Sequence, residues 1–136
     1  MGCCSKPVNL ASVFAALADN TRLRLLNLMA GREGCVCYFV EILGQGQPKI
    51  SRHLAYLRKA GIVAARREGK WMHYCICPPA DAAAASILAA VLASFRGDEQ
   101  MRADLARLDR ACCVQQELVL PEGAPRPVLI AAPRES

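Results

Sequence analysis

The stretch GQGQP, residues 44–48, constrains the fold more than any other part of the chain, because it separates two helical segments. Before it, residues 38–43 suit one short helix. After it, Pro48 suits the first turn of a second helix, since the N–H that proline lacks would have no partner there. Apolar residues then recur at spacings of four and three, at Ile50, Leu54 and Leu57. This periodicity predicts an amphipathic helix over residues 48–60, so the two segments form a helix-turn-helix.

The segment that follows, GIVAARREGKWMHYCI at residues 61–76, predicts a β-hairpin. Its side chains alternate along two strands that flank the turn REGK, with Gly69 at the tip. Pro78 and Pro79 end the second strand, because proline cannot donate to a sheet ladder. A basic hairpin directly after a helix-turn-helix forms a wing. The sequence therefore predicts a winged helix-turn-helix that is mainly α with a small β-hairpin.

Helical periodicity also predicts helices on both sides of this unit. They cover residues 9–18, 21–29, 80–95 and 98 to about 111. The third of these carries no charge after Asp81, and a helix that is apolar on most faces must be buried, which in a small protein predicts a dimer interface. We expect one domain over residues 9–113. It lies between a short N-terminal arm, residues 1–8, and an extended or disordered tail, residues 114–136.

Positive charge is concentrated in one part of the chain. Residues 49–70 hold seven Lys or Arg and one acid, a net charge of +6, whereas the rest of the chain sums to −1. A solvated basic face is one interpretation. A concentrated basic patch on an otherwise balanced protein is more typical of a surface that binds a polyanion, and here it coincides with the predicted helix-turn-helix and wing.

The start of the second helix and the wing supply the candidate DNA contacts, because the N-terminal residues of a recognition helix meet base edges in the major groove. These candidates are Gln47, Lys49, Ser51, Arg52, His53, Arg66, Arg67 and Lys70. We expect Gln47 and Arg52 to read bases and the adjacent Lys49 and Ser51 to touch phosphates. The wing residues should follow the DNA backbone or minor groove. His53 has two open interpretations, a DNA contact or a half-buried structural ring.

The chain has eight cysteines in four close pairs, Cys3/Cys4, Cys35/Cys37, Cys75/Cys77 and Cys112/Cys113. Its start, MGCCSKPVNL, has no apolar segment of a secretory signal, and no apolar run is long enough to span a bilayer. We therefore expect a cytoplasmic protein without a membrane partner. In that compartment thiols stay reduced, so the cysteines indicate metal or redox chemistry rather than structural disulfides.

Cys35 and Cys37 are the best candidates for a shared ion. Inside a regular helix, residues two apart diverge by about 200°. At a helix start, where Gly34 frees the backbone, both thiols can face one soft ion. The alternative is a pair of small side chains in the core. Cys75 and Cys77 alternate along the predicted strand, so packing is their expected role.

The segments LADNTRLRLLNLM, CVCYFVEIL and QPKISRHLAYLRKAGIVAARREGKWMHY resemble the ArsR/SmtB family of metal-sensing regulators, over residues 10 to 77. The resemblance implies a homodimer that represses metal-resistance operons and leaves operator DNA when an inducer binds. CVC resembles the trivalent-arsenic site of one branch, whose third cysteine is replaced here by Val40. The zinc branch uses Asp and His on the last dimer helix, but here Asp81 is followed by Ala83, which argues against a zinc sensor.

The resemblance leaves the missing ligand open. In some relatives a C-terminal cysteine pair binds arsenic, a role that Cys112 and Cys113 would fill here. In the cadmium and lead branch, cysteines of an N-terminal arm join a C-x-C pair, a role open to Cys3 and Cys4.

We therefore expect a homodimeric repressor whose inducer is As(III) or Sb(III), bound by cysteine thiolates. One alternative is a repressor that responds to Cd(II) or Pb(II), and another is a repressor that senses thiol oxidation. A thiol metal buffer would be a different class of protein, but the basic recognition helix argues against it. An enzyme is not expected, because the sequence has no paired carboxylates, nucleophile–base set or phosphate-binding loop.

Overall fold

The computed structural model describes residues 8–113, 123–125 and 128–129. In chain order its elements are α1 (Leu10–Leu17), α2 (Asn20–Met29), β1 (Arg32–Cys35), α3 (Val36–Leu43), α4 (Gln47–Lys59), β2 (Val63–Glu68), β3 (Trp71–Ile76), α5 (Ala82–Ser94), the 3-10 turn η1 (Phe95–Gly97), α6 (Glu99–Cys113) and β4 (Val128–Leu129). The predicted arm, residues 1–8, and tail, residues 114–136, fall largely outside the described residues.

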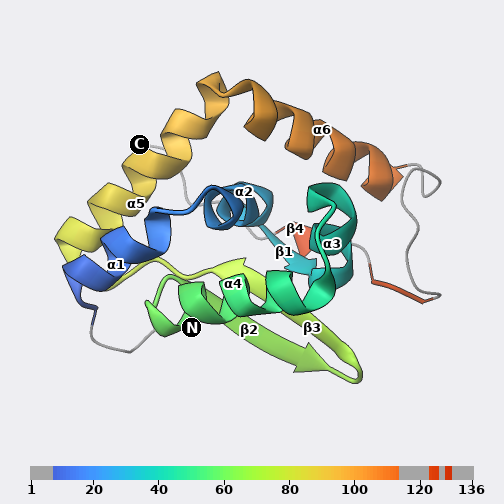
Figure 1. The fold of residues 1–136 in the computed structure, drawn as a ribbon, viewed down its shortest axis with the longest axis horizontal. Helices are drawn as coiled ribbons and strands as arrows, with labels where there is room; N and C mark the ends of the chain where they lie inside the picture. The colour runs from blue at the N-terminus through green and yellow to red at the C-terminus, as the bar shows by residue number, and fades with distance from the viewer. Residues whose placement is uncertain (1–7, 114–122, 126–127, 130–136) are drawn as a thin grey trace.

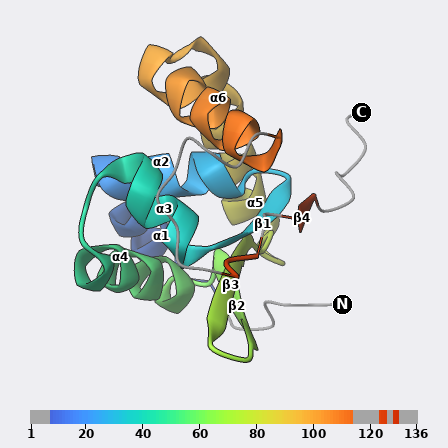
Figure 2. The ribbon, with the colours of Figure 1, turned by 90° about the vertical axis from the view of Figure 1, so that its right-hand side faces the viewer.

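The elements are arranged around α2 (Figures 1 and 2). Helices α5 and α6 arch over one side of α2, whereas α4 and the β2–β3 hairpin lie on the opposite side. Helix α3 lies between α6 and α4. The helix-turn-helix, formed by α3 and α4, and the wing therefore share one side of the molecule. The predicted winged helix-turn-helix, mainly α with a small hairpin, is confirmed.

Acidic and amide side chains fix the starts of four helices. Asn9, Asp19, Asp81 and Asp98 precede α1, α2, α5 and α6, and each accepts a hydrogen bond from a backbone N–H of the first turn at 2.8–3.1 Å. Such caps satisfy donors that have no partner within the helix. The helix starts inferred from the sequence agree with these caps to within about two residues.

Three strands form an antiparallel sheet, and the short strand β4 extends it in the order β2-β3-β1-β4. The hairpin pairs from Val63↔Ile76 to Glu68↔Trp71, as the alternation predicted. Strand β1, in contrast, was not predicted, because its four residues give no periodicity and its partner β3 lies almost 40 positions away.

Gly34 of β1 is required by close packing against α3. A Cβ atom at this position would lie 3.0 Å from the ring of Phe39, which is buried in the core. The glycine therefore allows β1 to approach α3 directly before the chain turns into that helix.

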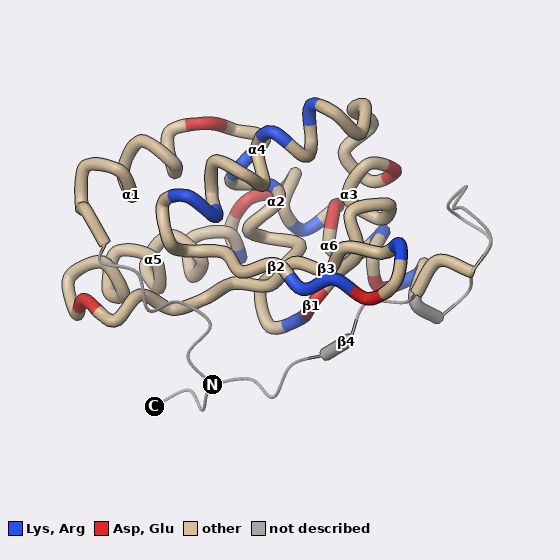
Figure 3. The backbone as a smooth tube through the Cα atoms, turned by 90° about the horizontal axis from the view of Figure 1, so that it is seen from below, with Lys and Arg blue, Asp and Glu red and all other residues tan. Residues whose placement is uncertain are grey.

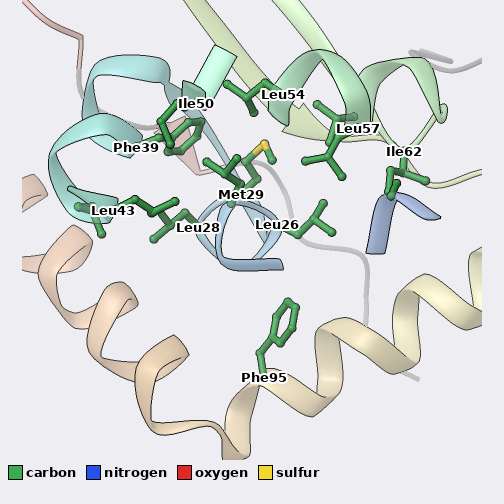
Figure 4. Packing of buried hydrophobic residues seen from close by; sticks show 14 of the residues in the cluster. Leu26, Leu28, Met29, Phe39, Leu43, Ile50, Leu54, Leu57, Ile62 and Phe95 are labelled. Atoms are coloured by element: carbon green, nitrogen blue, oxygen red, sulfur yellow. The ribbon is translucent and has the colours of Figure 1, made fainter. Parts of the chain in front are cut away.

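The core forms where the apolar faces of α2, α3 and α4 meet (Figure 4). The stripe predicted on α4, Ile50, Leu54 and Leu57, is fully buried. It packs toward α2, whose Leu25, Leu26, Leu28 and Met29 are also fully buried. Because α4 is anchored by this one face, its opposite face and its first turn remain available to solvent.

Helix α5 is mostly uncovered in the single chain, and its burial in a dimer interface stays a prediction. Only Ala84 and Leu88 of this helix are buried in the single chain. Helix α1 also exposes large apolar side chains, Leu10 at 40% and Phe14 at 55%. An apolar surface of this kind is typical of an interface with another protein. Within the described residues, no helix is both long and apolar enough to cross a membrane.

Polar contacts attach α6 to the other elements. The carboxylate of Asp104, which is 2% exposed, accepts two hydrogen bonds from Arg24 of α2 at 2.8 and 3.0 Å. Asn27 of α2 donates to the carbonyl of Met101 at 2.9 Å. Arg107 donates to the carbonyl of Ile42 near the end of α3 at 3.0 Å. Helix α6 is therefore bound to both α2 and α3.

The buried ion pair gives the first prediction. Replacing Asp104 with Ala leaves the largely buried guanidinium of Arg24 without its carboxylate, so the free energy of unfolding should fall by about 3 kcal/mol. Asp109→Ala is the matched control: it breaks the α6 pair with Arg32, but Asp109 is 63% exposed, so the loss should stay below about 1 kcal/mol. Urea unfolding of both variants measures the difference, and equal losses would contradict the role given to Asp104.

Candidate functional site

The thiols of Cys35 and Cys37 meet where β1 turns into α3. Cys35 is the N-cap of α3 and has extended backbone angles, φ −84° and ψ 147°, whereas Cys37 lies in the first turn. The two Sγ atoms are 3.0 Å apart. Residues two apart within a helix would point away from each other, so the extended cap residue is what brings the sulfurs together. The pair thus presents two sulfur ligands at one point.

A hydrogen bond polarises this thiol pair. Cys37 donates to the sulfur of Cys35, and this bond lowers the pKa of Cys35 to about 7. The same bond, together with burial, raises the pKa of Cys37. The thiolate is the form that binds metals and attacks electrophiles, and the lowered pKa favours it at Cys35. Cys35 is, however, fully buried in the core, and only Cys37 of the pair is partly exposed.

The remaining cysteines stand in different situations. Cys75 is a free, half-buried thiol on β3, and burial raises its pKa. Cys77 is buried and engaged in a disulfide, so the expectation that the cysteines avoid disulfides is wrong at this position. Sequence spacing could not reveal this bond, because the approach of two cysteines to bonding distance depends on the fold.

The described residues do not complete a metal site around the pair. Among them, no group of three or more His, Cys, Asp or Glu side chains is placed to hold an ion. Cys3 and Cys4 lie outside the described residues, and only the backbone of Cys112 and Cys113, in the last turn of α6, is described. Asp81, considered above for zinc, caps α5 through the backbone N–H of Ala84. As part of a metal site, the pair would supply only two ligands, and at least one more would have to come from elsewhere.

The first turns of α4 carry the candidate recognition residues. Gln47, Lys49 and Arg52 are exposed, and Ser51 and His53 are partly buried. Figure 3 shows that Lys and Arg lie along α4 and along the β2–β3 hairpin. The structure therefore brings together on one side the basic residues that the sequence analysis assigned to DNA.

His53 belongs to a contact between α1, α2 and α4. Arg22 donates to two carbonyl groups at the end of α1 at 2.8 and 3.1 Å, and its guanidinium lies 4.0 Å from the ring centre of Tyr56. The same guanidinium is 3.3 Å from Nδ1 of His53, which is also 3.8 Å from Asp19. The side chain of His53 is only 16% exposed. Of the two interpretations above, the geometry favours the structural ring.

The three basic residues of the wing differ in their partners. Arg67 donates to the carbonyl of Gly69 at 3.1 Å, and the ammonium of Lys70 lies 5.0 Å from the ring centre of Trp71. Arg66, in contrast, makes two hydrogen bonds to the carboxylate of Glu33, at 2.7 and 3.1 Å.

Glu33 was missed by the sequence analysis. The hydrogen bonds from Arg66 hold its pKa below the ordinary value, so it stays ionised at neutral pH. No signal in the sequence joins these two residues, because they are 33 positions apart and meet only through the sheet.

Comparisons with known proteins agree with this geometry. Residues 19–65 match the family described as bacterial regulatory protein, arsR family. The chain is 48% identical over 77 residues to the arsenical resistance operon repressor of Escherichia coli (strain K12), a match that covers 56% of this chain and 66% of that protein. It is 49% identical over 67 residues to the uncharacterized HTH-type transcriptional regulator MJ1325 of Methanocaldococcus jannaschii, covering 48% of this chain and 75% of that protein.

A solved structure supports the same fold. It is the homodimeric winged helix-turn-helix DNA-binding domain from Mycobacterium bovis, titled a possible ArsR-family transcriptional regulator. Its TM-score is 0.53 at 32% identity, and the alignment covers 66% of this chain and 81% of that one. The family match over residues 19–65 includes α3 and α4, the helix-turn-helix.

The environment of His53 predicts a pH effect. Burial lowers the pKa of His53, and the nearby cations Arg22, Lys49 and Arg52 lower it further. The carboxylate of Asp19 raises it, but the net shift is downward. The unfolded chain then binds a proton first as pH falls below about 6.5, so the folded state loses stability from there down to the lowered pKa. A His53→Gln variant should lack this loss. The test is to measure the free energy of unfolding of the unmodified protein and of the variant between about pH 7.5 and 5.5. Both proteins retain His73, so any contribution of His73 cancels in the difference between their pH curves. Parallel pH curves would contradict the effect.

Proposed function

The chain belongs to the arsR family of bacterial regulatory proteins, and from that premise we propose that it is a homodimeric repressor released from operator DNA by As(III) or Sb(III). The observation that carries the choice of inducer is the convergence of the Cys35 and Cys37 sulfurs at 3.0 Å. The match spans only 66% of the E. coli arsenical repressor, and that protein's activity is brought to this chain as part of the proposal.

The DNA-binding part of the proposal rests on α4 and the wing. Helix α4 is held by its buried stripe and presents Gln47, Lys49 and Arg52 to solvent. A helix anchored in this way fits the major groove with its first turns toward the bases. The exposed wing residues Arg67 and Lys70 would contact the DNA backbone beside it. Phosphate contacts of this kind give an affinity that falls steeply with salt.

The dimer part of the proposal rests on apolar surface that one chain leaves uncovered. Phe14 of α1 is 55% exposed, and most of α5 is not buried although it carries no charge. A second copy packed on α1 and α5 would cover both. Such a dimer would place two recognition helices about one DNA turn apart, which suits an operator with two half-sites.

The thiol part of the proposal follows from coordination chemistry. Soft ions prefer sulfur ligands, and trivalent arsenic binds thiolates. Cys35 and Cys37 would supply two of these, and a third would come from Cys112, Cys113, Cys3 or Cys4, with the partner subunit as one source. A third ligand from the arm, Cys3 or Cys4, would favour Cd(II) or Pb(II) instead.

Release would follow from a change in the position of α3. The thiol pair lies at the first turn of α3, and α3 packs against α4 through buried residues that include Phe39 and Ile50. Ligation would draw the start of α3 toward the third ligand and shift α4 with it. A ligated dimer that fits the operator less well leaves the DNA. By linkage, DNA must weaken inducer binding by the same factor.

Two lysines at opposite ends of α4 test the DNA contact. Lys49→Ala should weaken operator binding and reduce the slope of log affinity against log salt concentration by about 0.9, the loss of one phosphate contact. Lys59→Ala is the control, since it removes the same charge about 15 Å further along the helix. Operator titrations at several salt concentrations measure both slopes, and identical behaviour of the two variants would contradict the assigned docking.

Serine substitutions test the thiol site and thereby the proposed function. Cys35→Ser and Cys37→Ser should bind the operator as the unmodified protein does but no longer leave it when arsenite is added, because serine is a poor ligand for a soft ion. Cys75→Ser, which removes a free thiol of β3, should still respond. Operator titrations of reduced protein with arsenite, cadmium, zinc and peroxide separate the possibilities. Arsenite release by the double Cys35→Ser/Cys37→Ser variant would rule out this site.

A second candidate function, a thiol redox sensor, is favoured by the same sulfur contact and by the lowered pKa of Cys35. The Cys35 thiolate would attack a peroxide and become a sulfenic acid. Cys37 would then attack that sulfur, forming a disulfide and expelling water. Operator release by peroxide without response to any metal would support this function and exclude the metalloid site.

A further inference from the structure

We propose that Glu33 is a positioning residue that couples the thiol pair to the wing through its ion pair with Arg66. The inference rests on the proposed function and deepens it, since it adds a second connection between Cys35 and the DNA-binding surface. The first connection, through α3 to α4, was expected from the helix-turn-helix alone. The second runs through the sheet.

The position of Glu33 is the first step. It lies two residues before Cys35 on the same short strand, β1, and its side chain is 15% exposed. Its two carboxylate oxygens accept hydrogen bonds from Nε and Nη2 of Arg66 at 3.1 and 2.7 Å. A two-point contact of this geometry restricts both side chains more than a single hydrogen bond does. A displacement of β1 would therefore act on β2 through this contact.

The sheet register is the second step. His73 of β3 is paired with Cys35 on one side and with Arg66 on the other. His73 therefore lies between Cys35 and Arg66 in the sheet. The Glu33–Arg66 ion pair crosses β3 beside His73. The register of β1 with β3 comprises only Gly34↔Tyr74 and Cys35↔His73. Because this backbone pairing is so short, the side-chain ion pair makes a large part of the connection between β1 and the wing.

The composition of the wing is the third step. Arg66 is followed by Arg67 and then by the turn that carries Lys70. Arg67 and Lys70 are the two exposed wing cations proposed to contact DNA. When an ion draws Cys35 toward a third ligand, Glu33 moves with β1 and pulls Arg66 and the hairpin. The wing and α4 then leave their DNA-binding positions together.

The chain offers a matched control in Glu68. It also lies near Arg66, at 3.6 Å, but it belongs to β2 itself and is 63% exposed. Glu68→Gln removes the same charge from the surroundings of the same arginine. It also removes a 3.2 Å contact with His73 of β3, but that contact lies within the hairpin, so the connection from β1 to the wing is retained. Any effect specific to Glu33→Gln therefore reports coupling rather than local charge.

The first measurement uses the emission of Trp71, the single tryptophan of the chain, which begins β3 at the wing turn. Phenylarsine oxide, which bridges two neighbouring thiols, is the probe, and Cys35→Ser gives the background from other cysteines. We expect the emission of the wild-type protein to change on adding the probe. The change should persist in Glu68→Gln and be largely lost in Glu33→Gln. An equal change in both variants, or none above background in the wild type, overturns the proposal.

The second measurement is the ratio of operator Kd with arsenite to that without it. For Glu33→Gln this ratio should fall roughly 2- to 30-fold below that of the wild type. Arsenite uptake, followed by the absorbance of arsenic–thiolate bonds, should stay unchanged. A purely structural role would weaken operator binding equally in both states and leave the ratio intact, which overturns the proposal. If the wild type shows the emission change but is not released by arsenite, the proposed function fails while the coupling stands.

Discussion

The burial of α2 on two sides is the constraint on which the other elements depend. Its side chains Leu25, Leu26, Leu28 and Met29 are fully buried in the core that α2 shares with the apolar stripe of α4. On the side of α6, Arg24 binds the buried carboxylate of Asp104. A helix held from both sides has little freedom to move, because close-packed interiors resist small shifts. It therefore serves as the fixed frame against which α3, α4 and the wing are positioned.

Against this frame, the junction of β1 and α3 is the place where a small chemical change has the greatest structural effect. The chain turns there from an extended to a helical conformation within two residues, and the sulfurs of Cys35 and Cys37 meet at that turn. Both elements that leave the junction lead toward basic surface: α3 to α4, and β1 through Glu33 to the hairpin. A switch needs a structural element that has two arrangements. The inducer and DNA must each shift the equilibrium between those arrangements. The junction has the required connections to both DNA-binding elements.

What the sequence predicted and what it missed differ by the range of the interactions involved. The helices follow from periodicity, and in the structure local caps fix their starts, such as Asp19, Asp81 and Asp98, which bond to residues three positions on. The hairpin and the stripe of α4 follow from periodicity, and the convergence of the two thiols from their place at a helix start. Strand β1 and the Glu33–Arg66 pair depend on residues more than 30 positions apart, for which one sequence carries no local signal.

The pairing of charges also changes how the positive segment contributes to binding. Arg66 is one of the cations of residues 49–70 expected to contact DNA, yet it is already paired with Glu33 from outside that segment. DNA would have to compete with this carboxylate for Arg66, which lowers the number of counterions that binding releases. The arginine is therefore better suited to holding the wing in place than to adding affinity. In the proposed docking, affinity would come from exposed cations such as Lys49 and Arg67, whose side chains carry no such ion pair among the described residues.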